Sequence, residues 1–214
     1  MSDLLPLFPL PTTVLFPNVF LPLHIFEPRY RAMVGDAIEN DRLIGMVLLK
    51  PGWERHYEGR PAVYPIGCSG LVTHVERLAD GRYNLVLRGL ERFRIVEENH
   101  ERLYRRAMVE PLVERCVMAS DRVAMKTHRA RLEALLAPAV ERTAGRGSHA
   151  DLSTTAAMND EDLVNALAQY LDLEPLEKQA LLEHDSLRLR AASLVELLEM
   201  KMLAARTSGL SHVH

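Results

Sequence analysis

The feature that most constrains this chain is its proline-studded apolar opening, residues 5–28. Short hydrophobic pieces there are separated by five prolines, namely Pro6, Pro9, Pro11, Pro17 and Pro22. A sixth proline follows at position 28. Because proline has no backbone N–H, such a run cannot pair along its whole length as an ordinary strand. The stretch therefore predicts short, kinked strands at the start of a small barrel, with prolines where no neighbouring strand attaches.

The segment Glu27-Pro28-Arg29-Tyr30 predicts the beginning of a helix. Pro28 suits the first helical position, where an N–H would have no partner, and Glu27 lies near the positive end of the helix dipole. We expect the helix to reach about Asn40, because four apolar residues recur at helical spacing: Tyr30, Met33, Val34 and Ala37. In the structural interpretation, Glu27 caps this helix, Arg29 or Arg31 pairs with a carboxylate, and Tyr30 joins the core. A recognition surface is the alternative.

Strand signals extend to about residue 112. Candidate strands lie at 13–15, 19–26, 44–50, 63–78, 83–87 and 103–112. Asp80-Gly81 predicts a hairpin with a type I′ turn, and Gly89 predicts a break or bulge. Phe93 and Ile95 alternate with Arg92 and Arg94, which predicts one buried and one solvated face.

After residue 112 the hydrophobic period becomes helical. Four helices are expected, from Ser120 or Asp121, from Asn159 or Asp160, from Pro175, and from Asp185 or Ser186. Residues 143–155 lack a clear period and read as a loop. The predicted fold is α+β, with a β-rich domain at 1–115, a helical bundle at 116–206 and a flexible tail at 207–214.

Three segments carry a resemblance to a known family. They are the opening 8–34, the strand 66–70, and the hairpin 80–95 with its Gly89-Leu90-Glu91-Arg92-Phe93 strand; residues 177–183 add a weaker helical match. Together they resemble the amino-terminal, substrate-recognition domain of Lon proteases. The resemblance implies a stand-alone relative of that domain, folded as a small PUA-like β-barrel with one inserted helix, followed by a C-terminal helical bundle. It also implies a non-catalytic polypeptide-recognition module, with an RNA-binding PUA-like protein as the alternative.

Motifs for nucleotide or covalent chemistry are missing from the sequence. It contains no G-x-x-x-x-G-K-[ST] phosphate loop and no G-x-S-x-G elbow, and none of its four lysines lies in a context that suggests a serine–lysine dyad. We therefore expect no enzyme activity, no cofactor and no dependence on ATP. The nine histidines show no i, i+4 pair, so no metal site is expected. Cys68 and Cys116 are interpreted as buried thiols, with a disulfide between them and a nucleophilic Cys68 as the alternatives.

Charge argues against a nucleic-acid partner. The net charge is -3, and residues 1–112 carry fourteen basic and fourteen acidic side chains, whereas phosphate binding needs a basic excess on one face. Arg102, Arg105 and Arg106 are interpreted as a solvated strand edge. No apolar run is long enough to span a bilayer and no export signal is recognised, so a cytoplasmic location without a membrane partner is expected.

A long loop at 51–65 is the best candidate for a binding element. It carries the only tryptophan, Trp53, with His56 and Tyr57 nearby. Trp53 either anchors an interface or folds back to cover the barrel. Together with Glu27 and Arg29, these residues form the predicted peptide-binding set. The expected partners are unfolded or specific polypeptides, and a protease or chaperone acting in trans is a further candidate; the sequence leaves the oligomeric state open.

Overall fold

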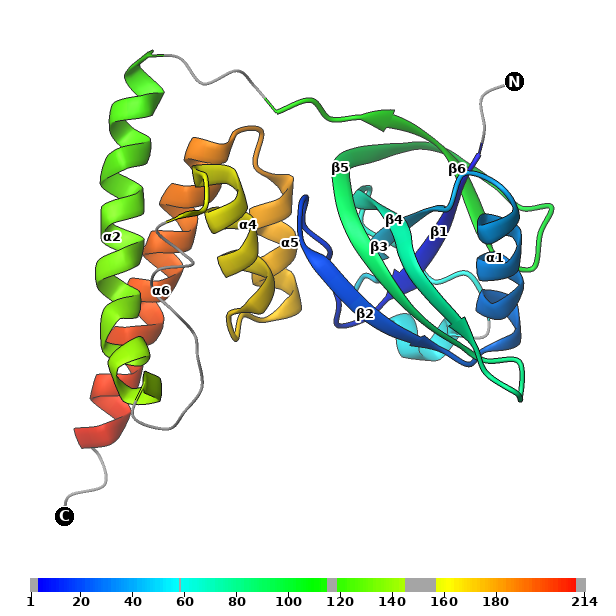
Figure 1. The fold of residues 1–214 in the computed structure, drawn as a ribbon, viewed down its shortest axis with the longest axis horizontal. Helices are drawn as coiled ribbons and strands as arrows, with labels where there is room; N and C mark the ends of the chain where they lie inside the picture. Colours follow the sequence, from blue (N-terminus) through cyan, green and yellow to red (C-terminus); the bar gives the residue numbers. More distant parts are fainter. Residues whose placement is uncertain (1–3, 58, 115–118, 145–156, 211–214) are drawn as a thin grey trace. The chain divides into compact units, whose positions relative to one another are not determined.

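The computed structural model describes residues 4–57, 59–114, 119–144 and 157–210 (Figure 1). The chain divides into two compact units. The first comprises Met1–Val113 and Asn165–Glu183, and the second comprises Glu114–Val164 and His184–His214. The predicted domain boundary near residue 115 stays a prediction. Among the described helices, none combines the length and the apolar composition needed to cross a bilayer.

A six-stranded sheet forms most of the first unit. Its strands are β1 (Leu5–Leu10), β2 (Phe20–Ile25), β3 (Leu43–Leu48), β4 (Ile66–Arg77), β5 (Tyr83–Asn99) and β6 (Arg105–Pro111). Their order is β2-β5-β4-β3-β1-β6, and β6 also pairs with β5. β1 and β3 are parallel, while every other pairing is antiparallel. Because β5 has 17 residues, its first part pairs with β2 and its last part with β6.

β1 corrects the expectation that the opening prolines mark unpaired edges. This strand has neighbours on both sides: Pro6 lies opposite β6, and Pro9 lies opposite β3. The two neighbours overlap only at Leu7, so each proline has one neighbour in register, which limits the cost of its missing N–H. Pro22 follows the expected rule, since β2 ends the strand order. No strand forms at 13–15, and β1 was not separately predicted.

The hairpin between β4 and β5 forms where Asp80-Gly81 predicts it, but with another turn. The N–H of Gly81 donates to the carbonyl of Leu78 at 2.9 Å, and the N–H of Leu78 donates to the carbonyl of Arg82 at 2.8 Å. Gly81 has a φ of 80°, whereas Asp80 is not among the residues with positive φ. A type I′ turn needs positive φ at both central residues. This is instead a three-residue loop with glycine at its left-handed position.

Gly89 does not interrupt β5, which is continuous through it, but the expected irregularity is present: the pairing with β4 shifts register between Gly89 and Arg92, opposite Gly70 and Cys68. Gly89 lets the segment 16–19 approach: the N–H of Asn18 donates to the Gly89 carbonyl at 2.9 Å, and the Gly89 N–H donates to the Val19 carbonyl at 2.8 Å. A Cβ on Gly89 would lie 2.0 Å from the carbonyl oxygen of Phe16. The glycine is therefore required for close backbone contact.

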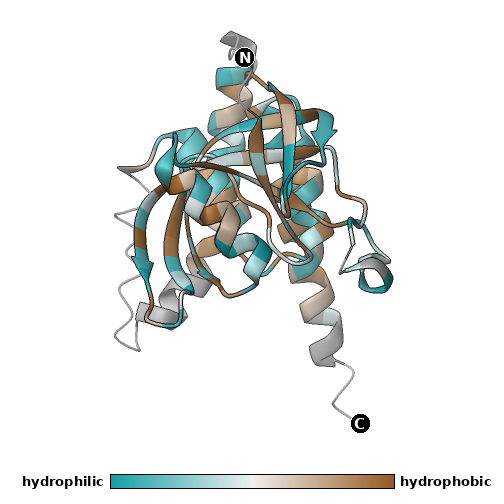
Figure 2. Cartoon of the chain, turned by 90° about the vertical axis from the view of Figure 1, so that its right-hand side faces the viewer, coloured by the Kyte–Doolittle hydropathy of each residue, from teal (hydrophilic) through white to brown (hydrophobic). Residues whose placement is uncertain are grey.

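Helix α1 (Pro28–Glu39) confirms its predicted position and buried face. Its four predicted core residues are all buried: Tyr30, Met33, Val34 and Ala37. Glu27 occupies the N-cap position, but its side chain makes no capping hydrogen bond. Hydrophobic and hydrophilic residues alternate along several strands (Figure 2), and the inward-facing set includes Leu7, Val47, Phe93 and Ala107.

Residues 165–183 belong to the first unit and explain the burial of Arg92. They include most of α4 (Asp160–Tyr170) and all of α5 (Pro175–Glu183), both predicted from the sequence. Arg92 was expected on a solvated face but is only 3% exposed. Its Nη1 donates to the carbonyl of Leu182 at 3.0 Å, and Gln179 Nε2 donates to the carbonyl of Ile66 at 3.0 Å. The solvated face predicted for Arg92 is therefore covered by helix.

The second unit contains α2 (Ala119–Ala144), the start of α4 and α6 (Leu187–Leu210). In α2, Met125 and Leu132 are buried, whereas Val123 is 69% exposed. The predicted cap Asn159 accepts a hydrogen bond from the N–H of Asp162 at 2.8 Å. Most of the loop expected at 143–155 and the end of the expected tail lie outside the described residues, and α6 continues through residues 207–210.

Candidate recognition site

The start of α1 and the 51–65 loop come together through one carboxylate. Glu27 accepts hydrogen bonds from Arg29 Nε at 3.0 Å and from the hydroxyl of Tyr57, and its ion pair with Arg29 Nη2 measures 2.9 Å. Arg29 Nη1 in turn donates to the backbone carbonyl of Tyr57 at 3.2 Å. Glu27 therefore links the helix start to the loop, which is a different task from the capping expected of it.

Aromatic rings surround the Arg29 guanidinium. Its Cζ lies 4.6 Å from the ring centroid of Tyr30 and 4.9 Å from that of Tyr57, within the range of cation–π attraction. Trp53, half-buried in the 3₁₀ helix η1 (Trp53–His56), packs edge-on against Tyr57 with centroids 5.4 Å apart. The side chain of His56 lies outside the described residues. Four of the five predicted residues thus form one cluster.

The cluster keeps its tyrosines protonated. Burial raises the pKa of Tyr30 to about 12, and the negative charge of Glu27 adds to this effect. Burial also raises the pKa of Tyr57, helped by the hydrogen bond to Glu27. Burial alone would lower the pKa of Arg29, but Tyr30 and Glu27 outweigh it, so this pKa is raised. At neutral pH the site therefore presents neutral phenols and a charged guanidinium.

A cavity of about 160 Å³ opens beside this cluster. Its wall combines arginines, tyrosines and apolar side chains, namely Pro9, Arg29, Tyr30, Leu49, Tyr57, Gly59, Arg60, Pro61, Leu103, Tyr104 and Arg105. Two of the predicted site residues, Arg29 and Tyr57, line this concave surface. Binding clefts typically mix apolar walls with a few polar groups, and at about 160 Å³ this one is smaller than the roughly 300–1,000 Å³ of a whole small-molecule site.

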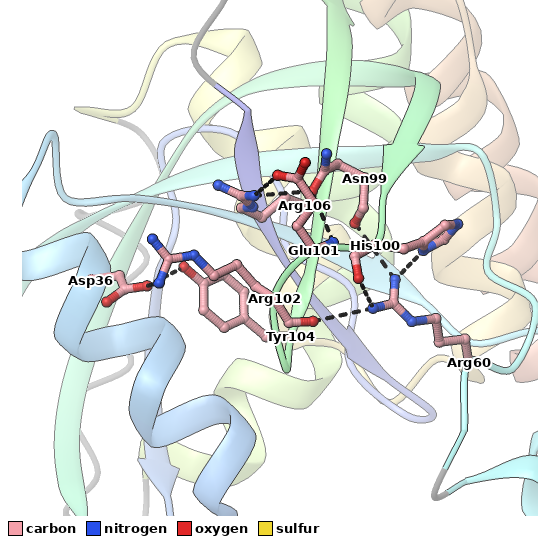
Figure 3. A network of polar contacts seen from close by, with 8 residues as sticks. All are labelled: Asp36, Arg60, Asn99, His100, Glu101, Arg102, Tyr104 and Arg106. Carbon is pink, nitrogen blue, oxygen red and sulfur yellow. Dashed lines mark hydrogen bonds and ion pairs between the residues drawn. The ribbon is translucent and has the colours of Figure 1, made fainter.

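The turn that leads into β6 carries a polar network next to the cavity (Figure 3). Arg106 Nη2 pairs with Glu101 at 3.1 Å, and Arg102 Nη1 lies 3.7 Å from Asp36. Arg105, expected on a solvated edge, is buried and pairs with Glu98 at 3.1 Å. Each of the three arginines predicted as a strand edge thus has a carboxylate partner.

The alternative chemistry considered for Cys68 gains no geometric support. Cys68 is fully buried in β4, as the sequence predicts, and Cys116 lies outside the described residues. In the part of the chain that the structure describes, no group of three or more His, Cys, Asp or Glu side chains is placed to hold a metal ion.

Sequence reasoning missed Arg60, Tyr104 and the cavity itself. Arg60 stands in the loop already singled out, three residues after Tyr57, so its charge in a long loop was the available signal. No sequence signal pointed to Tyr104. Its hydroxyl donates to Asp36 Oδ2 at 2.5 Å, and this contact joins residues that are 68 positions apart.

Comparison with known proteins agrees with the fold. The family profile described as the ATP-dependent protease La (LON) substrate-binding domain matches residues 4–200. Among solved structures, the N-terminal domain of a Mycobacterium avium complex Lon protease has a TM-score of 0.70 at 18% identity, covering 92% of this chain and 98% of that one. A Lon N-terminal domain protein from Xanthomonas campestris has a TM-score of 0.58 at 23% identity, covering 91% and 98%.

Curated relatives are full-length proteases. Lon protease 2 of Myxococcus xanthus is 28% identical over 199 residues, which is 93% of this chain and 24% of the relative. Lon protease of Anaeromyxobacter dehalogenans is 28% identical over 197 residues, or 92% and 23%. The chain therefore spans about a quarter of the length of these relatives. It belongs to the Lon substrate-binding domain family.

Proposed function

We propose that this chain is a non-catalytic polypeptide-recognition module. The observation that carries the proposal is the family match over residues 4–200 to a substrate-binding domain. The recognition surface contains the predicted set Glu27, Arg29, Trp53, His56 and Tyr57. Its partners are unfolded or specific polypeptides, and the bound polypeptide is passed to a protease or chaperone acting in trans.

Geometry supports this surface in two ways. The ring of Tyr57 contacts the ring of Trp53 and also the guanidinium of Arg29. Tryptophan, tyrosine and arginine are the residue types that contribute most to binding energy at protein interfaces. The Glu27 bonds fix Arg29 and Tyr57 in advance, so that little side-chain entropy is lost on binding.

The fold that we propose for the strands is a small PUA-like barrel with α1 inserted, followed by a C-terminal helical bundle. The double pairing of β6 with β1 and β5 supports closure, since five strands then form a hydrogen-bonded ring. β2 stays at one end of the strand order. An end strand is the place where an extended peptide can add by main-chain hydrogen bonds.

The single tryptophan offers a direct test. We expect a permanently unfolded, reduced and carboxymethylated protein to shift the emission of Trp53, and the same protein in its folded state to leave it unchanged. Trp53→Ala should weaken binding of the labelled unfolded protein at least about tenfold, as interface anchors do. Leu176→Ala, at a residue 51% exposed in α5, is the matched control.

Absence of binding to the unfolded protein would overturn the proposal. Equal affinity of the wild type and Trp53→Ala would move the site elsewhere and refute this surface. The RNA-binding alternative predicts a different pattern: affinity for RNA that falls steeply between 50 and 200 mM salt, roughly in the manner of phosphate contacts.

A further inference from the structure

Within the described residues, the hydroxyl of Tyr30 is an unused donor in the wall of the cavity. Tyr30 is 4% exposed and lines the cavity, and among the described residues its hydroxyl has no hydrogen-bond partner, although it is not one of the fully buried atoms that lack one. The other two cavity tyrosines are engaged, Tyr57 with Glu27 and Tyr104 with Asp36. This oxygen therefore still reaches the open space of the cavity, where a ligand can supply the acceptor that a tyrosine hydroxyl in a protein usually finds.

Positive charge surrounds the same space. Arg29, Arg60 and Arg105 all line the cavity. Glu27 and Glu98 pair with Arg29 and Arg105. Arg60 is instead held by the backbone carbonyls of His100 and Arg102, each at 3.2 Å, and by the His100 ring (Figure 3). Within the described residues, three guanidiniums are thus balanced by two carboxylates.

The guanidiniums also interact with one another across the cavity. Burial lowers the pKa of Arg105, and the charges of Arg60 and Arg29 lower it further, whereas Glu98 opposes the effect. An anion placed among these groups would relieve their mutual repulsion and accept from Tyr30, whose pKa of about 12 keeps its proton at neutral pH.

Apolar side chains complete the wall. Pro9, Leu49 and Pro61 line the cavity, and Leu103, which is 82% exposed, also borders it. A ligand that suits this wall carries an anionic group next to an apolar one. A carboxylate on a polypeptide has this character, since apolar side chains can lie beside it.

We propose that the cavity holds a carboxylate of the bound polypeptide, with Tyr30 as hydrogen-bond donor and Arg60 as the principal balancing charge. The inference rests on the proposed function and names the chemical group that this site selects. The carboxylate has two possible sources, the chain terminus and an Asp or Glu side chain. In both cases an apolar neighbour packs against Leu103.

Paired peptides test the proposal. One unfolded peptide is prepared with a free and with an amidated C-terminus, and a second amidated peptide carries Glu or Gln at one internal position. We expect about a tenfold or greater loss of affinity within at least one pair, because hydrogen bonds to charged groups are worth this much. Loss in the first pair assigns the terminal carboxylate, and loss in the second assigns the side chain.

Three variants locate the effect. Tyr30→Phe keeps the buried ring and removes only the hydroxyl, and Arg60→Gln removes an exposed charge, so neither substitution disturbs the core. Both should weaken binding of the carboxylate peptide to the level of its neutral partner while leaving the neutral partner unchanged. Arg77→Gln, which removes an exposed charge elsewhere in the first unit, should have no effect on either.

Two results would overturn the inference, and they differ. If all four peptides bind equally well, or if Tyr30→Phe and Arg60→Gln weaken charged and neutral peptides alike, the carboxylate site is refuted while polypeptide recognition stands. If no peptide and no unfolded protein binds, the proposed function fails and the inference fails with it.

Discussion

Replacing Gly89 by alanine tests the tightest backbone contact of the first unit. The added Cβ would lie 2.0 Å from the carbonyl oxygen and 2.9 Å from the carbonyl carbon of Phe16. Both atoms belong to the backbone, so no side chain can rotate away. Either β5 or the segment 16–19 has to move by about 1 Å to restore ordinary contact distances.

The magnitude follows from what this movement disrupts. The Gly89 carbonyl and N–H take part in hydrogen bonds of 2.9 and 2.8 Å with residues 18 and 19, worth about 1 kcal/mol each. Overpacking a rigid site adds roughly 1–3 kcal/mol. We therefore expect Gly89→Ala to lower the free energy of unfolding by about 3–5 kcal/mol, a large share of the roughly 5–15 kcal/mol typical of a domain.

Gly35 provides the matched control. It lies within α1, and a Cβ there would meet nothing within 4 Å. Alanine is the better helix former, so Gly35→Ala should raise the free energy of unfolding by about 0.5–1 kcal/mol. Replacing glycine by alanine is thus expected to lower the free energy of unfolding at Gly89 and to raise it at Gly35, within the same unit.

Urea unfolding followed by tryptophan emission measures both effects. Trp53 lies in the first unit, so its emission reports on that unit even if the two units unfold separately. A loss smaller than about 1 kcal/mol for Gly89→Ala, or a loss rather than a gain for Gly35→Ala, would refute the reasoning from backbone approach.

Two further predictions use the same measurement. Arg92→Met leaves the buried carbonyl of Leu182 without its donor and should cost about 1.5–3 kcal/mol, whereas the exposed Arg94→Met should change stability by less than about 0.5 kcal/mol; similar losses for both would contradict the burial argument. Tyr30 has a pKa near 12 when folded and 10 as the reference value, so its contribution is complete below pH 10 and is lost as pH rises toward 12. Tyr30→Phe should flatten the alkaline fall in stability, and unchanged slopes would count against it.

Local signals predicted the helices well. Pro28 opens α1 and Pro175 opens α5, while Asn159 caps α4 through its side chain. Such starts depend on residues within one turn, which the sequence contains. The buried face of α1 follows for the same reason, because helical spacing decides which side chains point to one side.

Predictions that depended on distant residues were less accurate. The alternation around Phe93 is a local pattern, but the burial of Arg92 depends on Leu182, 90 positions later. Pro6 and Pro9 were expected at an edge, yet β3 and β6 supply neighbours that no local pattern reveals. Long-range pairing overrides local preference in such cases.

In the candidate site, some features follow from local signals and others depend on distant residues. Residue type and context singled out each of four site residues, Glu27, Arg29, Trp53 and Tyr57. Their contact could not be predicted, because the hydrogen bond from Tyr57 to Glu27 joins residues that are 30 positions apart in the sequence. Arg105 was assigned to a solvated edge because strand alternation alone does not show what covers a face. The unused hydroxyl of Tyr30 was beyond reach, since the sequence predicts only that the ring is buried.

The discontinuous first unit has a consequence for synthesis on the ribosome. Its strands are complete at Val113, but residues 165–183 belong to the same unit. About 70 further residues must be translated before Glu183 emerges, which takes roughly 4–14 s at typical elongation rates. During this interval Arg92 and the carbonyl of Ile66 are exposed, because their hydrogen-bond partners in α5 have not yet emerged. Packing of residues 165–183 onto the strands is therefore the last step in the folding of the first unit.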